Sequence, residues 1–165
     1  MNAPASPESV YATPRAGWIS LLNRAPRAAL LQHWDGLKLA PAYDWIRKPE
    51  FGLVMLRGRV GGSGARFNLG EATVTRCALR LRATQADAPR EAVPLVGLGM
   101  VLGRDAERVR TAALIDALLQ DPAHHDAIAQ GVLQPLARAM ADKQAQQAAQ
   151  AAATKVEFFT MVRGD

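Results

Sequence analysis

The sequence VGGSGARFNLGEATVTRCALRL, residues 60–81, decides the fold prediction for this chain. Three glycines stand among its first five residues, and a long segment rich in Val, Thr and Leu follows them. Glycine adopts the backbone conformations that tight turns require, whereas β-branched residues favour extended strands. The stretch therefore predicts a loop that leads into a long strand.

The glycine loop has two interpretations. Backbone N–H groups can converge around Gly61, Gly62 and Gly64 to bind an anion. Ser63 and Arg66 add a hydroxyl group and a guanidinium group, both of which suit phosphate oxygens. The loop lacks the Lys-Ser/Thr pair that completes a nucleotide-binding P-loop, so an ordinary glycine-rich hairpin loop is the alternative.

Basic residues are concentrated in this part of the chain. Residues 47–82 contain eight Lys and Arg against two Glu, a surplus of +6, whereas the whole chain has a formal net charge of +5. The surplus indicates an anionic ligand or an acidic partner surface, and a solvated basic face is the alternative. Strand alternation allows five arginines to share one face of a sheet. These are Arg57, Arg59, Arg76, Arg80 and Arg82.

The segment before the glycine loop predicts a β-hairpin. Residues 41–47 and 51–60 are extended in pattern, and the turn-like sequence Lys-Pro-Glu separates them. In the second arm Val54, Leu56 and Val60 share one face, which we expect to point to the core. Further back, residues 17–39 carry apolar side chains at helical spacing on both sides of a proline, which predicts two short helices.

The segment after the basic strand supplies a last strand and the C-terminal helices. Residues 93–102 are nearly all apolar and predict a strand buried on both faces, in which Gly97 and Gly99 mark a close approach by another backbone. Asp105 is suited to cap a helix that follows to about residue 120. A long helix over residues 135–155 has little side-chain bulk beyond Met140, so it lies against a partner element or projects.

These patterns predict an α+β domain over residues 17–165, with a mainly antiparallel sheet of about four strands between N-terminal and C-terminal helices. The length of 165 residues and the 49% hydrophobic content suit one domain with a real core. The proline-rich residues 1–16 are expected to form a mobile arm. A lone cysteine, Cys77, and the lack of a secretory leader pattern favour the cytoplasm, and no apolar run is long enough to span a membrane.

Catalytic and metal-binding motifs are absent from the sequence. It contains neither a P-loop, a dinucleotide fingerprint, a cysteine cluster nor an HExxH pair. We interpret His124 and His125, beside Asp121, as part of a surface helix cap, because adjacent helical residues point about 100° apart. Cys77 lies within a predicted strand and is expected to be a core residue. We therefore assign no catalytic residue and no metal ligand to this chain.

Three stretches in this order resemble the PhnG family, a subunit of the bacterial carbon-phosphorus lyase complex. They are GLVMLRGRVGGSGARFNLGEATVTRCALRL, GRDAERVRTAALIDALLQ and the terminal VEFFTMVRGD. The resemblance extends from about residue 17 to the end of the chain. The proline-rich start and the loop at residues 83–92 depart from the family pattern without touching these motifs.

The resemblance implies a cytoplasmic complex with PhnH-like, PhnI-like and PhnJ-like subunits and an ATPase-like subunit. In such a complex a phosphonate, for example methylphosphonate, is transferred onto the ribose of ATP and adenine is released. ATP is a substrate of the complex, and the resemblance implies no cofactor bound by this chain alone. It links the nucleosidase chemistry to the PhnI-like partner, which agrees with the lack of a catalytic constellation here.

Three functions remain open from the sequence. In the first, the chain is an assembly subunit whose C-terminal segment docks on its partners or under its own core, through Phe158, Phe159, Met161, Val162 and Arg163. In the second, the chain contributes phosphate- or phosphonate-binding residues to a shared active site, namely Gly61, Gly62, Ser63, Gly64, Arg66 and Arg76. In the third, the sequence pI near 10.0 reflects nucleic-acid binding, although no nucleic-acid motif is visible.

Overall fold

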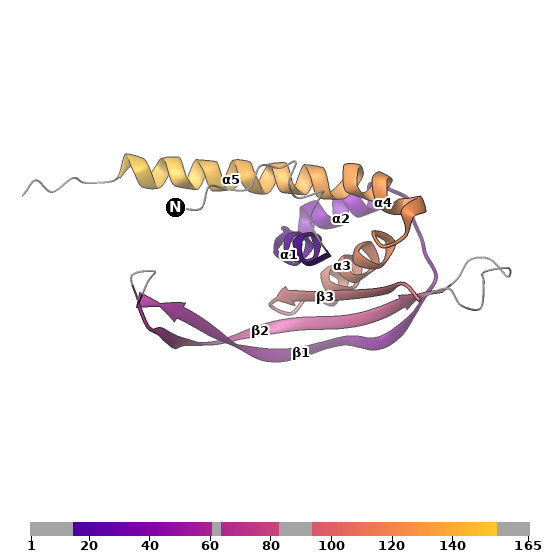
Figure 1. Cartoon of the computed structure of the whole chain (residues 1–165), viewed down its shortest axis with the longest axis horizontal. Coiled ribbons are helices and arrows are strands. Elements are labelled where there is room, and N and C mark those ends of the chain that lie inside the picture. The colour runs from indigo at the N-terminus through magenta and orange to yellow at the C-terminus, as the bar shows by residue number, and fades with distance from the viewer. Residues whose placement is uncertain (1–14, 61–63, 83–93, 155–165) are drawn as a thin grey trace, which may run out of the picture.

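The computed structural model describes residues 15–60, 64–82 and 94–154 of the chain. It confirms the α+β class, with a three-stranded antiparallel sheet in the order β1-β2-β3 and the helices on one side of it (Figure 1). The strands are β1 (Tyr43–Arg59), β2 (Arg66–Leu81) and β3 (Val96–Leu102). The helices are α1 (Arg15–Arg24), α2 (Arg27–Gly36), α3 (Ala106–Leu118), α4 (Pro122–Ile128) and α5 (Gln134–Ala153), with a π-helical turn η3 (Ala129–Leu133) before α5.

The prediction of about four strands is wrong by one strand. The expected hairpin turn at Lys-Pro-Glu does not form, because β1 runs through it. Arg47 pairs with Ala78 and Glu50 with Arg76, so two residues of β1 stand opposite one residue of β2. Proline cannot donate a ladder hydrogen bond, but an edge strand tolerates it at such a bulge. Pro49 therefore bends the strand without reversing the chain.

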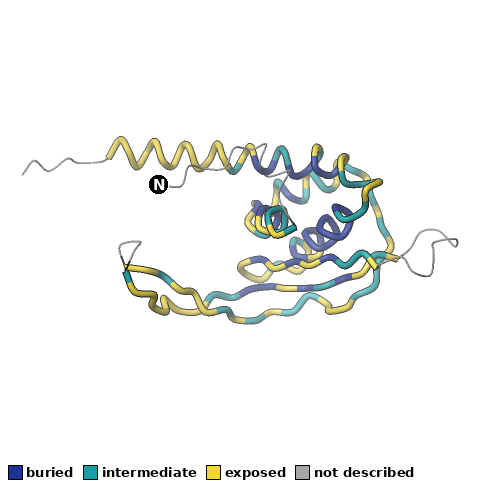
Figure 2. Tube along the Cα trace, in the orientation of Figure 1, coloured by how far each residue is buried: buried dark blue, intermediate teal, exposed yellow. Residues whose placement is uncertain are grey.

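Helix α3 lies at the centre of the molecule. On one side it packs against the sheet, where Cys77, Leu79 and Val101 are buried with residues of α3. On the other side it packs against α1, α2 and α4, around a second cluster that includes Leu30 and Ile115 and continues into η3 and the start of α5. Figure 2 shows the buried residues gathered around α3 and the middle of the sheet. The domain is held together by two apolar layers that share one helix.

The two glycines of β3 allow this strand to touch α3, as predicted. A Cβ atom added to Gly97 would lie 1.8 Å from the carbonyl oxygen of Ala113, and one added to Gly99 would lie 2.4 Å from that of Val109. The prediction that β3 is buried on both faces is wrong, however. Its other face is exposed, because no described element covers it. The exposed side chains are Leu98, Met100 and Leu102.

Two segments project beyond the packed core in the same direction (Figure 1). One is the hairpin arm, which we define as residues 53–60 and 64–73, where β2 has β1 as its neighbour but has passed the end of its pairing with β3. The other is the part of α5 from residue 141 to residue 153, in which every residue is exposed. Leu56 and Val60 lie in the arm and are exposed, so the prediction that they face the core is wrong.

The helix boundaries follow local sequence signals. Pro26 is the N-cap of α2, Gly36 is its last residue, and the Asp105 carboxylate accepts a hydrogen bond from the Arg108 N–H at the start of α3. Helix α1 begins at Arg15, two residues before the predicted start of the domain at residue 17. The remainder of the predicted N-terminal arm lies outside the described residues.

Candidate functional site

The residues of the glycine loop that the structure describes lie at the tip of the hairpin arm. The Gly64 N–H donates a hydrogen bond to the Val60 carbonyl oxygen at 2.9 Å, and Arg66 pairs directly with Arg59 across the strands. An Arg59 Nη1 group lies 3.4 Å from the Gly64 carbonyl oxygen. The strand register thus places two arginines directly opposite each other at the tip. The other predicted loop residues, Gly61, Gly62 and Ser63, lie outside the described residues.

Arg76 does not join this group. It lies ten residues from Arg66 on the same strand, which separates the two by about 33 Å of extended chain. Its Nε atom lies 2.6 Å from a Glu50 carboxylate oxygen on β1, and the Arg76 hydrogen bond holds the pKa of Glu50 below its usual range. The predicted anion-binding residues are therefore divided between the tip of the arm and the middle of the sheet.

The other arginines of the predicted basic face are divided as well. Arg82 lies 2.5 Å and Arg80 lies 3.9 Å from the Asp44 carboxylate, whose pKa the Arg82 hydrogen bond lowers. Arg57 and Arg59 stand at the far end of β1, in the hairpin arm. The five arginines do not form one basic face, because three of them lie beside carboxylates and two lie at the tip.

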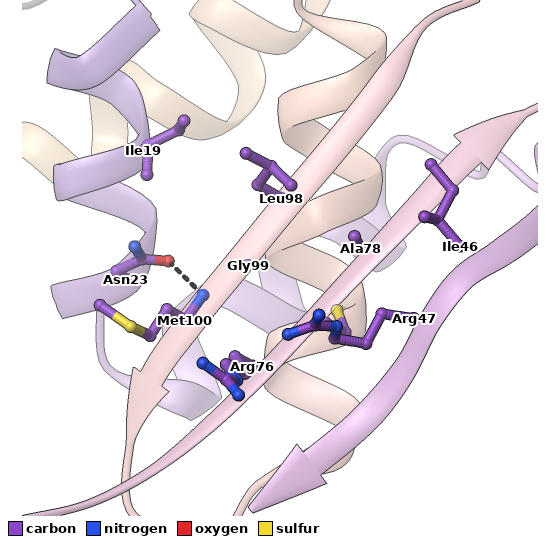
Figure 3. A pocket seen from close by; sticks show the side chains of 10 residues that line it. Ile19, Asn23, Ile46, Arg47, Arg76, Ala78, Leu98, Gly99 and Met100 are labelled. Carbon is purple, nitrogen blue, oxygen red and sulfur yellow. Dashed lines mark hydrogen bonds between the residues drawn. The ribbon is translucent and has the colours of Figure 1, made fainter. Parts of the chain in front are cut away.

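The outer face of the sheet carries a shallow hollow of about 450 Å³ (Figure 3). Its apolar walls come from Ile19 of α1, Ile46 of β1 and Leu98 of β3, and Arg47 and Arg76 stand at one side. Such a lining suits an apolar group of a partner. It offers neither a general base nor an activated nucleophile.

Cys77 borders this hollow but is a core residue, as predicted. Its side chain is buried and its thiol donates a hydrogen bond to the Val109 carbonyl oxygen at 3.4 Å. Burial raises the pKa of the thiol to about 11. A nucleophilic cysteine needs a lowered pKa, so this thiol is protonated and inert at neutral pH.

The two adjacent histidines belong to a helix start, in agreement with the sequence-based interpretation. The Asp121 carboxylate caps α4 through the Ala123 N–H at 2.9 Å and lies 2.8 Å from His124 Nδ1, and both contacts lower its pKa. His125 Nδ1 donates instead to the Leu119 carbonyl oxygen at 2.7 Å. Within residues 15–60, 64–82 and 94–154, no group of three or more His, Cys, Asp or Glu side chains is arranged to hold a metal ion.

A buried carboxylate on α3 was missed by the sequence analysis. Asp116 is fully buried and accepts hydrogen bonds from the Arg15 guanidinium at 2.6 and 3.0 Å, from Trp18 Nε1 at 2.8 Å and from the Leu98 N–H at 2.8 Å. The Asp116 hydrogen bond raises the pKa of Arg15. The network ties α1, α3 and the outer edge of β3 together. The signal that could have revealed it is a single charged residue within the apolar run AALIDALL, residues 112–119.

The C-terminal residues predicted to bind partners, Phe158 to Arg163, lie outside the described residues. In the part of the chain that the structure describes, the helices are too short or too polar to cross a membrane. The exposed apolar side chains of the sheet and the arm define the class of this protein. It has the surface of a subunit that docks on other proteins.

The comparison with known proteins identifies the family. The chain belongs to the PhnG family, because the model of that family, described as phosphonate metabolism protein PhnG, matches residues 13–164. A relative from Rhizobium meliloti (strain 1021) is 38% identical over 165 residues, which cover 100% of this chain and 99% of that protein. The relative is the PhnG subunit of an alpha-D-ribose 1-methylphosphonate 5-triphosphate synthase. The resemblance drawn from the sequence is confirmed.

Proposed function

We propose that this chain is the PhnG-type assembly subunit of a synthase that transfers a phosphonate, such as methylphosphonate, onto the ribose of ATP and releases adenine. The observation that carries the proposal is the 38% sequence identity, over the full length of both chains, to a relative that is named as a subunit of such a synthase. ATP is then a substrate of the assembled complex. The described surface supports a docking role, because the sheet and the arm expose several large apolar side chains of the kind that protein interfaces cover.

The partners in this proposal are PhnH-like, PhnI-like and PhnJ-like subunits together with an ATPase-like subunit. The projecting part of α5 supports docking at the C-terminal end of the chain, since the side chains of residues 141–153 are exposed and pack on no other described element. An alanine-rich helix has high intrinsic propensity but gains little stability alone. It is well suited to present the residues that follow it, Phe158 to Arg163, to a neighbouring subunit.

Truncation after Ala153 tests this role. We expect the shortened chain to fold with an unchanged thermal unfolding midpoint, because the removed residues follow an exposed helix end. We also expect it to lose co-purification with the other subunits when all are expressed together. Deletion of residues 1–12, which precede the family match, is the control and should leave the complex intact. Normal assembly of the truncated chain would contradict the proposed docking role of the tail.

We propose as a second candidate that the arm tip contributes to phosphate or phosphonate binding in a shared active site. The direct cross-strand pairing of Arg59 with Arg66 favours it, because like charges in that position repel each other and a bound anion relieves the repulsion. Arginine forks also match phosphate oxygens. Gly61, Gly62 and Ser63 would supply backbone donors beside them. The Gly64 N–H already donates to the Val60 carbonyl oxygen, and Arg76 lies too far along β2 to join the same anion.

Substitution of Arg66 by Ala tests the second candidate. If the guanidinium binds a triphosphate in the assembled complex, the Michaelis constant for ATP should rise about tenfold, which corresponds to the loss of a charge-assisted hydrogen bond of about 1.5 kcal/mol. The measurement is steady-state kinetics of the complex, with assembly checked by size-exclusion chromatography. Arg76→Ala is the control and should leave the constant unchanged. Unaltered kinetics for Arg66→Ala would remove this candidate.

A further inference from the structure

The hairpin arm is a two-stranded ribbon that exposes six large apolar side chains. Its exposed apolar side chains come from both strands, and adjacent residues of a strand point to opposite faces, so Met55 and Leu56 place apolar groups on both faces of the ribbon. Isolated two-stranded hairpins are at best marginally stable in water. The exposed residues are Leu53, Met55, Leu56, Val60, Phe67 and Leu69, with exposed fractions between 42% and 68%.

The arm is shaped by two glycines. Gly58 leaves space for side chains of the facing strand, since an added Cβ would lie 2.9 Å from Leu69 Cδ1 and 3.4 Å from a ring carbon of Phe67. Gly70 has a φ angle of +145°, which other residues rarely adopt, and it stands next to the register shift that leaves Leu69 without a direct partner in β1. Bulges of this kind redirect side chains near functional surfaces. The backbone at these two glycines therefore sets the positions of the apolar side chains of Phe67 and Leu69.

The charges of the arm differ from those of an ordinary solvated hairpin. Residues 53–60 and 64–73 include Arg57, Arg59 and Arg66 but one acidic residue, Glu71, and no lysine. Exposed strand edges are usually protected by lysine, whereas protein interfaces are enriched in Phe, Met and Arg. The composition of the arm matches an interface rather than a protected edge.

The free edge of β3 is covered by contacts within this chain, whereas the hairpin arm is not covered. Two outward N–H groups of β3 already donate to side chains. The Leu98 N–H donates to Asp116 at 2.8 Å, and the Met100 N–H donates to Asn23 Oδ1 at 3.2 Å, a bond that Figure 3 shows. The arm lies beyond the end of β3 and away from the helical core (Figures 1 and 2). Among the described residues, nothing of this chain covers its faces.

We propose that the hairpin arm inserts into an apolar groove, rimmed by carboxylates, on another subunit of the synthase. The inference rests on the proposed function, which supplies the partner subunits. Charge indicates which protein binds the arm. Three arginines on the arm and a net charge of +5 on the chain would repel a second copy of this chain. A partner with acidic side chains around an apolar groove complements both Arg57 and the exposed apolar side chains of the arm.

The test uses the full chain and the remaining subunits of the synthase, purified as a complex without it. Leu53→Glu places a charge on the arm, and Leu102→Glu is the matched control, because the two leucines are 63% and 64% exposed and Leu102 lies outside the arm. We expect Leu53→Glu to weaken binding at least about 30-fold, as loss of an interface hot spot does, and Leu102→Glu to change it less than about threefold. Thermal unfolding of each free variant should match the parent chain.

The electrostatic part has a separate measurement. Arg57→Glu should weaken binding about tenfold or more at low salt, and the affinity of the parent chain should fall as salt rises, because the rim charges are screened. Salt-independent binding of the parent chain, or unchanged binding of Arg57→Glu, would contradict the proposal that carboxylates surround the groove.

Four results would overturn the inserted arm itself. The first is full binding by Leu53→Glu, and the second is an equal loss of binding for Leu53→Glu and Leu102→Glu. The third is a dimer of the isolated chain that Leu53→Glu dissociates, because the arm would then bind a second copy. The fourth is faster amide exchange in the arm after removal of residues 154–165, because this chain's own tail would then cover the arm. If the parent chain itself fails to bind the other subunits, the proposed function fails instead.

Discussion

Gly97→Ala is expected to destabilise the domain by about 3 kcal/mol or more, at the upper end of the range for overpacked cores. The new methyl carbon would lie 1.8 Å from the Ala113 carbonyl oxygen, 2.8 Å from its carbonyl carbon and 2.9 Å from Ala117 Cβ. All three atoms are backbone or Cβ atoms of a buried helix, so no flexible side chain can yield. Helix α3 must move away from β3, and it is the element that both core clusters share. The free energy of unfolding in urea measures the loss.

Gly52→Ala is the matched control for this substitution. Gly52 also lies in a strand, but a Cβ atom added there has no neighbouring atom within 4 Å. We expect its effect to stay within about 1 kcal/mol, since replacing glycine at a compatible position mainly restricts the unfolded chain. A similar loss for both variants would show that strand propensity, and not the contact with α3, explains the glycine at position 97.

Asp116→Ala should be the second large loss, of about 2 to 3 kcal/mol, because it removes the buried acceptor that several donors share, while the half-exposed Arg15 that remains can be solvated. The substitution leaves the Leu98 N–H without its acceptor, removes the partner of Trp18, and leaves the Arg15 guanidinium with the Val96 carbonyl oxygen alone. Loss of these bonds should free α1 from the edge of β3. The free energy of unfolding and the amide exchange rate of Leu98 measure both effects.

Asp126→Ala is the control for Asp116→Ala. Asp126 is an exposed residue of α4, so its removal should change the free energy of unfolding by less than about 0.5 kcal/mol. Trp18→Phe gives an intermediate case, because it removes one donor and leaves the ion pair, and about 1 kcal/mol is expected. Equal effects of all three substitutions would contradict the assignment of the network.

The sequence predicted those features that depend on neighbouring residues. Pro26 and Gly36 bound α2 and Asp105 caps α3, because caps act within one turn of their own residue. Alternation along β2 correctly separated buried Cys77 and Leu79 from exposed Arg76. Gly97 and Gly99 were correctly interpreted as a close backbone approach, since glycine inside a strand has few other physical reasons.

The missed features depend on partners that are distant in the sequence. Pro49 resembles a turn residue locally, but pairing with β2 keeps β1 straight enough to continue through a bulge. Leu56 shares a strand face with Val54, yet it is exposed because the hairpin extends past the helices that would cover it. Asp116 gains its role from Arg15 and Trp18, about 100 residues away along the chain.

The sequence by itself determined the α+β class, the helix ends, the alternation of the central strand and the membership in the PhnG family. Only the tertiary structure decided the number of strands, the division of the arginines between carboxylates and the arm tip, and which apolar faces are left uncovered. The physical reason is that periodicity shows which side chains share a face. Whether that face is buried depends on the packing of distant elements, and here the packing ends before the hairpin arm and α5 do.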